Sequence, residues 1–164
     1  MAKSRAEQLK RERFAKVARD QGIKFGEIVG DELDKLESRI TTRYVRPGGR
    51  GEIWEKLAYP FCYHRGDDHS WRRLGELVPS NPHQRVIVWP DYAQGGAFVF
   101  SGVQPLVGVL SEALWSELLV TDPDLTFMLV FSDHRIMYAQ GSAMDLLDNA
   151  YGVESVALVS GPDI

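Results

Sequence analysis

Cysteine is nearly absent from this chain of 164 residues, because Cys62 is the only one. A single cysteine excludes a disulfide within the chain and is typical of a reducing compartment. Long apolar runs are also missing, since no stretch approaches the roughly 18 consecutive apolar residues of a transmembrane helix. Residues 1–22 contain no apolar segment of the kind found in signal peptides. We therefore expect a soluble cytoplasmic protein that does not bind membranes.

The residues that are present favour a packed core. Apolar residues make up 44% of the chain and include four Trp and seven Phe. We predict an α+β fold, in which helices pack on a mainly antiparallel sheet of five or six strands. Residues 1–50 are predicted to form an N-terminal helical arm, and residues 51–164 to form the sheet domain.

The segment 117–141 is the centre of the predicted sheet. Its apolar runs predict three consecutive strands, over 117–120, 125–131 and 136–140. Asp122-Pro123-Asp124 and Ser132-Asp133-His134-Arg135 have the residues of tight turns between them. Residues 127–131, FMLVF, are apolar at every position, so both faces of this strand need to be covered by helices. Such short connections favour an antiparallel meander.

The other elements follow from apolar periodicity and turn residues. Helices are predicted over 4–19, 31–44 with Asp31 as N-cap, 53–57, a segment carrying Trp71, Leu74 and Leu77, 103–115, and a closing helix after Ser142. Further strands are predicted over 61–64, 85–89, 97–100 and 156–159, of which 85–89 and 97–100 form a hairpin and 156–159 lies at the sheet edge. Helix 4–19 has a thin apolar stripe of Leu9, Phe14, Val17 and Ala18, so we expect it to be loosely docked or ordered by a partner.

The net charge of −4 conceals an uneven distribution. Residues 1–50 carry 13 Lys and Arg against 8 Asp and Glu, whereas residues 51–164 carry 6 against 15. From Glu112 onward, Arg135 is the only basic residue among nine acidic ones. An acidic surface of this kind repels nucleic acid and favours a basic protein partner.

One sequence cluster suggests a metal site. His64, Asp67, Asp68 and His69 fall within six residues, and in a regular strand Cys62 shares a face with His64. The i,i+4 spacing of helical histidine ligands is missing, and no second ligand cluster accompanies this one. We therefore favour a surface turn and expect no metal and no cofactor.

Two further patterns have both a chemical and a structural interpretation. Asp133 and His134 have the residue types of an acid–base pair, but no nucleophile motif accompanies them, so we interpret them as the tip of a hairpin. The four tryptophans, at positions 54, 71, 89 and 115, have rings that can stack on nucleic-acid bases. Their spread over separate elements favours core packing, and the acidic charge argues against nucleic acid.

Three segments together carry a family resemblance: GEIWEKLAYPF from Gly51, RVIVWPDYAQGGAFVFSGVQPLVGVLSEA from Arg85, and SELLVTDPDLTFMLVFSDHRIMYAQGSA from Ser116. They resemble a family of small, functionally unassigned bacterial proteins that is similar to the immunity proteins of polymorphic toxin systems. The resemblance covers about residues 51–143. It implies a non-enzymatic protein that binds a cognate toxin and occludes the toxin's active site.

Charge and resemblance together give a functional expectation. We expect an immunity protein whose acidic surface binds a basic toxin. The predicted partner-binding residues are Asp122, Asp124, Asp133, Asp145, Asp148, His134 and Tyr92. A regulatory or scaffolding module that uses the basic N-terminal helix is the second hypothesis, and a small hydrolase using Asp133 and His134 is the third. The sequence leaves the oligomeric state open.

Overall fold

The computed structural model describes residues 5–48, 51–79, 84–91, 96–113, 115–152 and 155–157. Within these ranges the strands form one eight-stranded sheet with the order β1-β4-β3-β5-β6-β7-β2-β8. The strands are β1 (Phe25–Ile28), β2 (Phe61–Arg65), β3 (Arg85–Pro90), β4 (Ala97–Ser101), β5 (Leu118–Thr121), β6 (Phe127–Phe131), β7 (Ile136–Gly141) and β8 (Ser155–Ala157). Every neighbouring pair in the sheet is antiparallel.

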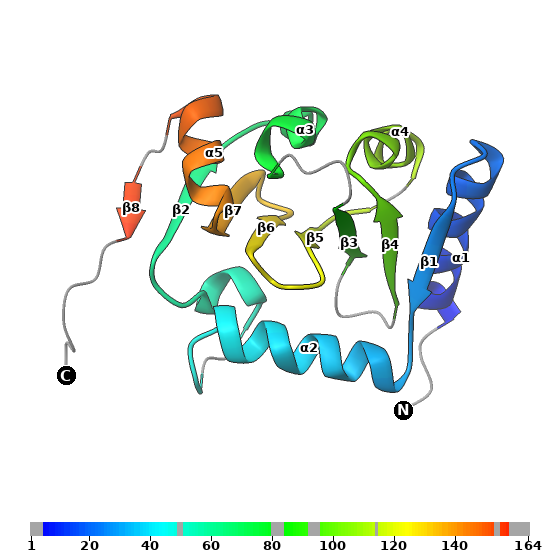
Figure 1. The fold of residues 1–164 in the computed structure, drawn as a ribbon, viewed down its shortest axis with the longest axis horizontal. Helices are drawn as coiled ribbons and strands as arrows, with labels where there is room; N and C mark the ends of the chain where they lie inside the picture. The colour runs from blue at the N-terminus through cyan, green and yellow to red at the C-terminus, as the bar shows by residue number, and fades with distance from the viewer. Residues whose placement is uncertain are drawn as a thin grey trace.

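Helices cover both faces of this sheet (Figure 1). They are α1 (Arg5–Asp20), α2 (Asp31–Tyr44), α3 (Leu74–Leu77), α4 (Gln104–Glu112), α5 (Ala143–Tyr151) and two 3₁₀ helices, η1 (Ile53–Lys56) and η2 (Ser70–Arg73). Apolar residues of α1, α3, α4, α5 and η2 form a core with one face of the sheet. Apolar residues of α2 and η1 form a second core with the other face. The fold is therefore α+β, as predicted, with more strands than the five or six expected.

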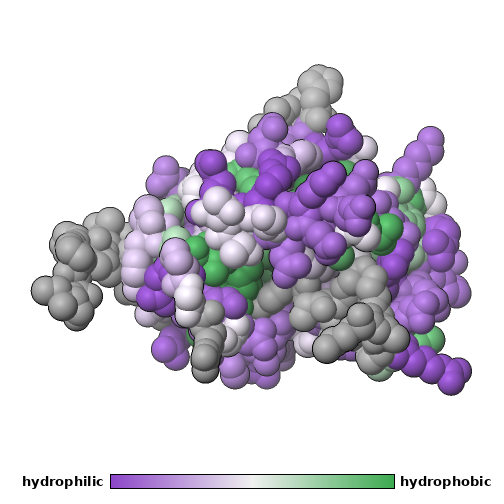
Figure 2. Space-filling model, turned by 90° about the horizontal axis from the view of Figure 1, so that it is seen from below, coloured by the Kyte–Doolittle hydropathy of each residue, from purple (hydrophilic) through white to green (hydrophobic). Residues whose placement is uncertain are grey.

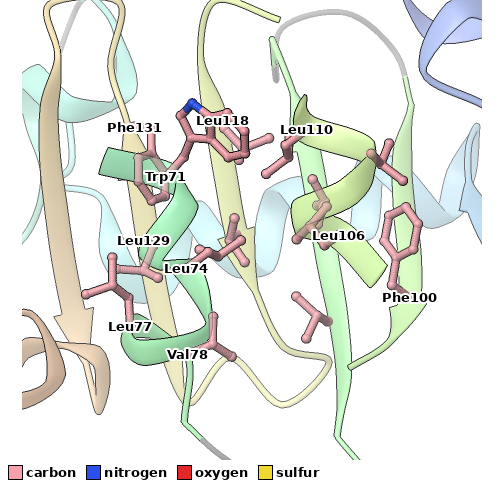
Figure 3. Close-up of a cluster of buried hydrophobic side chains, with 14 of the residues drawn as sticks. Trp71, Leu74, Leu77, Val78, Phe100, Leu106, Leu110, Leu118, Leu129 and Phe131 are labelled. Atoms are coloured by element: carbon pink, nitrogen blue, oxygen red, sulfur yellow. The ribbon is translucent and has the colours of Figure 1, made fainter. Parts of the chain in front are cut away.

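Strand β6 lies between the two cores. Its five residues are all buried. Phe127, Leu129 and Phe131 belong to the core under α3, α4 and α5, part of which is drawn in Figure 3, whereas Met128 and Val130 face the core under α2. Side chains of a strand alternate between the two faces of a sheet, so a strand that is apolar at every position fits only between two covered faces. The predicted central strand is confirmed.

The outer face of the α2 layer is seen in Figure 2, where hydrophilic residues predominate and small hydrophobic areas lie between them. Helix α2 itself buries Leu33, Leu36, Ile40 and Tyr44 against the sheet. None of the helices in the described ranges has both the length and the apolar character needed to cross a membrane.

Most predicted elements are confirmed within one or two residues at each end. The predicted hairpin of 85–89 and 97–100 is the pair β3 and β4. Pro105 lies in the first turn of α4. The strand predicted over 156–159 corresponds to β8 at the sheet edge, and residues 158 and 159 fall outside the described ranges. The segment with Trp71, Leu74 and Leu77 forms η2 and α3, and all three side chains are buried.

Residues 1–50 contribute to the sheet as well as to its helical cover. Strand β1 was not predicted, because its four residues include a glycine and lack a continuous apolar pattern. It forms by pairing with β4, where Phe25 lies opposite Phe100. The predicted N-cap of α2, Asp31, is wrong: Gly30 occupies that position, and Asp31 lies in the first turn.

Helix α1 docks firmly on the sheet, contrary to the expectation of loose docking. Phe14 is 1% exposed and stacks on Phe98, with ring centroids 4.7 Å apart. Ala15 and Ala18 are buried beside it, whereas Leu9 is 56% exposed. A narrow stripe suffices because Phe14 contacts the rings of both Phe98 and Phe100 of β4.

The acidic end of the sheet as candidate functional site

Several strands begin or end together at one end of the sheet. Pro90 of β3 lies opposite Leu118 of β5, and Leu118 lies opposite Phe131 of β6. On the other side of β6, β7 begins opposite Phe131, and Arg65 at the end of β2 lies opposite Ile136. The adjoining loops carry five carboxylates: Asp67, Asp68, Asp91, Glu117 and Asp133. We call this region, defined by these five residues, the acidic end.

A cavity of about 290 Å³ opens at the acidic end. Three of the five carboxylates belong to its lining, and aromatic side chains form part of its wall. The lining residues are Asp67, Asp68, Ser70, Trp71, Trp115, Ser116, Phe131, Ser132, Asp133, Arg135, Ile136 and Met137.

The aromatic wall is held in place by hydrogen bonds to the backbone. The indole Nε1–H of Trp71 donates to the carbonyl oxygen of Asp68 over 2.8 Å, and that of Trp115 donates to the carbonyl oxygen of Leu110 over 3.1 Å. The two rings meet edge to face with centroids 6.1 Å apart. Trp71 and Phe131 come from η2 and β6 and lie at the same end of the core (Figure 3). The wall is therefore rigid and aromatic.

The cavity carboxylates differ in their partners. The Oδ1 atom of Asp67 accepts the backbone N–H of His69 over 2.7 Å and the hydroxyl of Ser70 over 3.3 Å. The first of these bonds is the main reason why the pKa of Asp67 is lowered. Asp68 pairs with the guanidinium of Arg135 over 2.8 Å. Arg135 is thus the cation of the cavity lining, and one carboxylate already neutralises it.

Asp133 and His134 form the exposed tip of the turn between β6 and β7. The Nε2 atom of His134 lies 3.5 Å from Oδ1 of Asp133, and their side chains are 72% and 47% exposed. The turn closes with the N–H of Arg135 donating to the carbonyl of Ser132 over 3.1 Å. Asp133 lines the cavity, whereas His134 lies against Trp54 with ring centroids 6.5 Å apart. The two side chains therefore do not converge on the cavity.

Asp91 joins three segments at the acidic end. Its Oδ1 atom accepts the N–H and the hydroxyl of Ser116 and the N–H of Glu117, over 3.0, 2.6 and 3.2 Å. Its Oδ2 atom pairs with Lys10 of α1 over 3.2 Å. Burial raises the pKa of Asp91, but the hydrogen bonds from Ser116, Lys10 and Glu117 outweigh it, so the pKa is lowered. Asp91 is thus a structural carboxylate.

The environment of Glu117 shifts its pKa in the opposite direction from that of Asp91. Its pKa is raised to about 7, first by burial and then by the negative charges of Glu52, Asp133 and Asp91, with Lys10 opposing them. Burial is the larger cause, and the neighbouring carboxylates add to it.

The predicted partner-binding residues do not form one surface. Asp133 and His134 lie at the acidic end, and Tyr92 lies outside the described residues. Asp122 and Asp124 lie at the opposite end of β6, in the turn that closes with the N–H of Leu125 donating to the carbonyl of Asp122 over 3.0 Å. Asp145 and Asp148 are exposed on α5.

Asp122 is the one buried residue among the predicted partner-binding residues that the structure describes. Only 4% of its surface is exposed. Its carboxylate accepts hydrogen bonds from the N–H and the hydroxyl of Thr126, over 2.7 and 2.6 Å, and from the amide of Gln84, over 3.0 Å. These internal donors make Asp122 a cap of its turn and leave its carboxylate little capacity for further hydrogen bonds.

The residues that the sequence offered as metal ligands make other contacts in the structure. The ring of His64 stacks on Tyr151 with centroids 4.5 Å apart, and Cys62 is buried and donates its thiol to the carbonyl of Met144 over 3.7 Å. Burial raises the pKa of the Cys62 thiol to about 11, which makes it a poor nucleophile. Within the described ranges, no group of three or more His, Cys, Asp or Glu side chains is arranged to hold a metal ion.

The chain matches no protein-family model, no curated protein and no solved structure. The site must therefore be interpreted from its own geometry.

Sequence reasoning missed Asp91 and Glu117, and it treated Asp67 and Asp68 only as possible metal ligands. A signal for the first two was present, since Asp91 comes two residues after the predicted strand 85–89 and Glu117 opens another. Paired antiparallel strands bring such positions to one edge. The position of Asp67 and Asp68 at this end depends on the pairing of β2 with β7, two strands that are far apart in the sequence.

Proposed function

We propose that this protein binds a basic protein partner through the acidic end, and that the partner is a bacterial toxin whose active site the bound protein occludes. The observation that carries the proposal is the excess of negative charge around a preformed cavity. Asp67, Asp68 and Asp133 line the cavity with one guanidinium, that of Arg135, and the side chain of Asp133 is 47% exposed. Unbalanced charge at a rigid site accelerates association with an oppositely charged protein and contributes to specificity.

The proposed surface is smaller than the set of residues predicted from the sequence. It includes Asp133 and His134 with the newly found Asp68 and Glu117, and it omits Asp122. Asp124 and Asp145 are exposed carboxylates away from the acidic end. They serve as charge-matched controls, because replacing either one changes the net charge as much as replacing Asp133.

The test is co-expression with the product of the adjacent gene, provided that this product arrests growth when it is expressed alone. We expect the wild-type protein to restore growth and to bind the toxin with an affinity that falls as salt increases. Asp133→Asn should weaken binding by about 5- to 10-fold, whereas Asp124→Asn and Asp145→Asn should change it less than about twofold. Growth arrest that persists with the wild-type protein would contradict the proposal.

A small hydrolase is a second candidate, which one observation favours. Glu117 has a pKa of about 7 and lies near Asp91, whose pKa is lowered, and a pair of carboxylates with separated pKa values is typical of acid–base catalysis. The two candidates differ in their response to Glu117→Gln. This substitution removes the proton donor of a hydrolase and should abolish its activity, whereas a partner-binding protein should lose only part of its affinity, because Glu117 is one of several residues in the proposed surface.

A scaffolding role for the basic helix α1 has less support. Lys10 pairs with Asp91 and Arg11 pairs with Glu27 over 2.9 Å, both within this chain. Phe14 is buried in the core. The apolar face of the helix thus packs against the sheet of this chain.

A further inference from the structure

We propose that the cavity at the acidic end receives one arginine side chain of the protein partner. The inference rests on the proposed function in one respect, namely that the partner is a basic protein. It goes further by naming the side chain that is recognised and the place that receives it.

The size of the cavity fits a single side chain. Sites for small molecules and cofactors usually measure about 300–1,000 Å³. The cavity measures about 290 Å³, which is at the lower limit of that range. A long side chain that enters from a protein surface needs less space than a cofactor, because the rest of the partner remains outside.

The charge of the lining selects a cation. Asp67, Asp68 and Asp133 face one cationic side chain, Arg135, in the lining. Arg135 already pairs with Asp68. A second guanidinium would meet Asp133, which lines the cavity and has a side chain that is 47% exposed. An anionic ligand such as a phosphate would be repelled by the same groups.

The aromatic wall favours arginine over lysine. A guanidinium is planar, less strongly hydrated than an ammonium, and stacks on aromatic rings while its N–H groups bind a carboxylate. A guanidinium of this chain already lies over one ring of the wall, since the Cζ atom of Arg72 is 5.6 Å from the ring centroid of Trp71. Trp115 and Phe131 provide the remaining aromatic surface of the cavity.

The direct test uses three blocked tripeptides, Gly-Arg-Gly, Gly-Lys-Gly and Gly-citrulline-Gly, and no toxin. Citrulline has nearly the shape of arginine but no charge. Binding is followed by the indole N–H resonances in ¹H–¹⁵N spectra at low ionic strength. We expect the arginine peptide to shift the resonances of Trp71 and Trp115 with a dissociation constant on the order of millimolar, the lysine peptide to bind more weakly, and the citrulline peptide to cause no saturable shift. Trp89, on the other face of the sheet, is the internal reference.

Two variants with opposite expected effects separate this site from general surface charge. Asp133→Asn should weaken the binding of the arginine peptide by about 2- to 5-fold. Arg135→Asn should strengthen binding of the same peptide by a similar factor, because this substitution removes a competing cation and releases Asp68. Asn suits this position, where φ is +63°, better than most other residues. Asp145→Asn on α5 is the control and should leave the affinity unchanged.

The inference is overturned if the citrulline peptide binds as well as the arginine peptide, or if Arg135→Asn weakens binding. It is also overturned if Asp145→Asn has the same effect as Asp133→Asn. Its failure can be told apart from that of the proposed function. If the wild-type protein binds the toxin but not the arginine peptide, the proposed function stands and the arginine site fails. If it binds the peptide without restoring growth, the arginine site stands and the proposed function fails.

Discussion

The two ends of β6 carry the same type of residue in a tight turn and use it in opposite ways. At one end, the carboxylate of Asp122 is buried and accepts hydrogen bonds from Thr126 and Gln84. At the other end, Asp133 is exposed, and its charge contributes to the raised pKa of Glu117. One carboxylate organises the fold, whereas the other adds unbalanced charge to a surface.

This difference shows that acidic residues in turns cannot be counted together as a binding surface. What matters is whether the chain itself supplies donors to the carboxylate. Asp91 makes the same point within the acidic end, because it is surrounded by donors although Asp133 and Glu117 are close to it. A carboxylate saturated by internal donors has little capacity left for a partner.

The largest effect is expected for Asp122→Ala. It leaves the N–H and hydroxyl of Thr126 and the amide of Gln84 without their acceptor in a partly buried turn. We expect the free energy of unfolding, measured by urea denaturation, to fall by about 3 kcal/mol. A loss as small as that of a surface substitution would remove the distinction between the two ends of β6.

Asp91→Ala should have the next largest effect. It removes the acceptor for Ser116 and Glu117 and the partner of Lys10, so the free energy of unfolding should fall by about 2 kcal/mol. Asp91→Asn keeps one acceptor oxygen and should cost less. Because the pKa of Asp91 is lowered in the folded state, its contribution is present above the ordinary pKa of 3.8 and is lost as the pH falls through the lower folded value. Equal losses for the two variants at pH 7 would contradict the assignment of Asp91 as a hydrogen-bonded anchor.

Glu117→Gln should change stability in the other direction. The pKa of Glu117 rises from 4.5 to about 7 on folding, so the folded state holds this proton more tightly. The wild-type protein therefore loses stability as the pH rises from about 4.5 to about 7, and above that range it carries the full cost of the buried charge. Glutamine removes this cost. We expect a gain on the order of 1 kcal/mol at pH 8, reduced by partial exposure to solvent, and almost none near pH 4.

Thermal unfolding of both proteins at the two pH values measures this difference. A gain that is the same at pH 4 and pH 8 would show that Glu117→Gln acts through packing. It would then give no information about charge at the acidic end.

The sequence predicted the elements whose signals are local. Strand β6 is apolar at every position, and the turns on either side contain Asp, Pro and Ser, so the meander from β5 to β7 could be predicted with its turns. Strand β1 has no such signal, because its conformation depends on pairing with β4, about 70 residues further along the chain. Local pattern therefore predicts elements better than it predicts their pairing.

The candidate site was less predictable for the same reason. The turn chemistry of Asp122 was visible in the sequence, but the hydrogen bond that it accepts from Gln84, 38 residues away, was not. Asp68 reaches Arg135 only because β2 pairs with β7. The cavity wall needs Trp71 and Trp115 from separate helical segments. Charge could thus be counted from the sequence, whereas its arrangement required the tertiary structure.

The smallest effect on stability is expected for Asp133→Asn, and its sign is informative. Asp133 is exposed, and it raises the pKa of Glu117 through charge repulsion. Removing its charge should leave the free energy of unfolding within about 0.5 kcal/mol of the wild-type value, with a slight gain at pH 8. Asp124→Asn, at the other end of β6, should give no gain, because Asp124 does not contribute to the raised pKa of Glu117. Urea denaturation of both variants at pH 8 measures the difference. If Asp133→Asn instead lowers stability as Asp122→Ala does, Asp133 anchors its turn, and the two ends of β6 use their carboxylates in the same way.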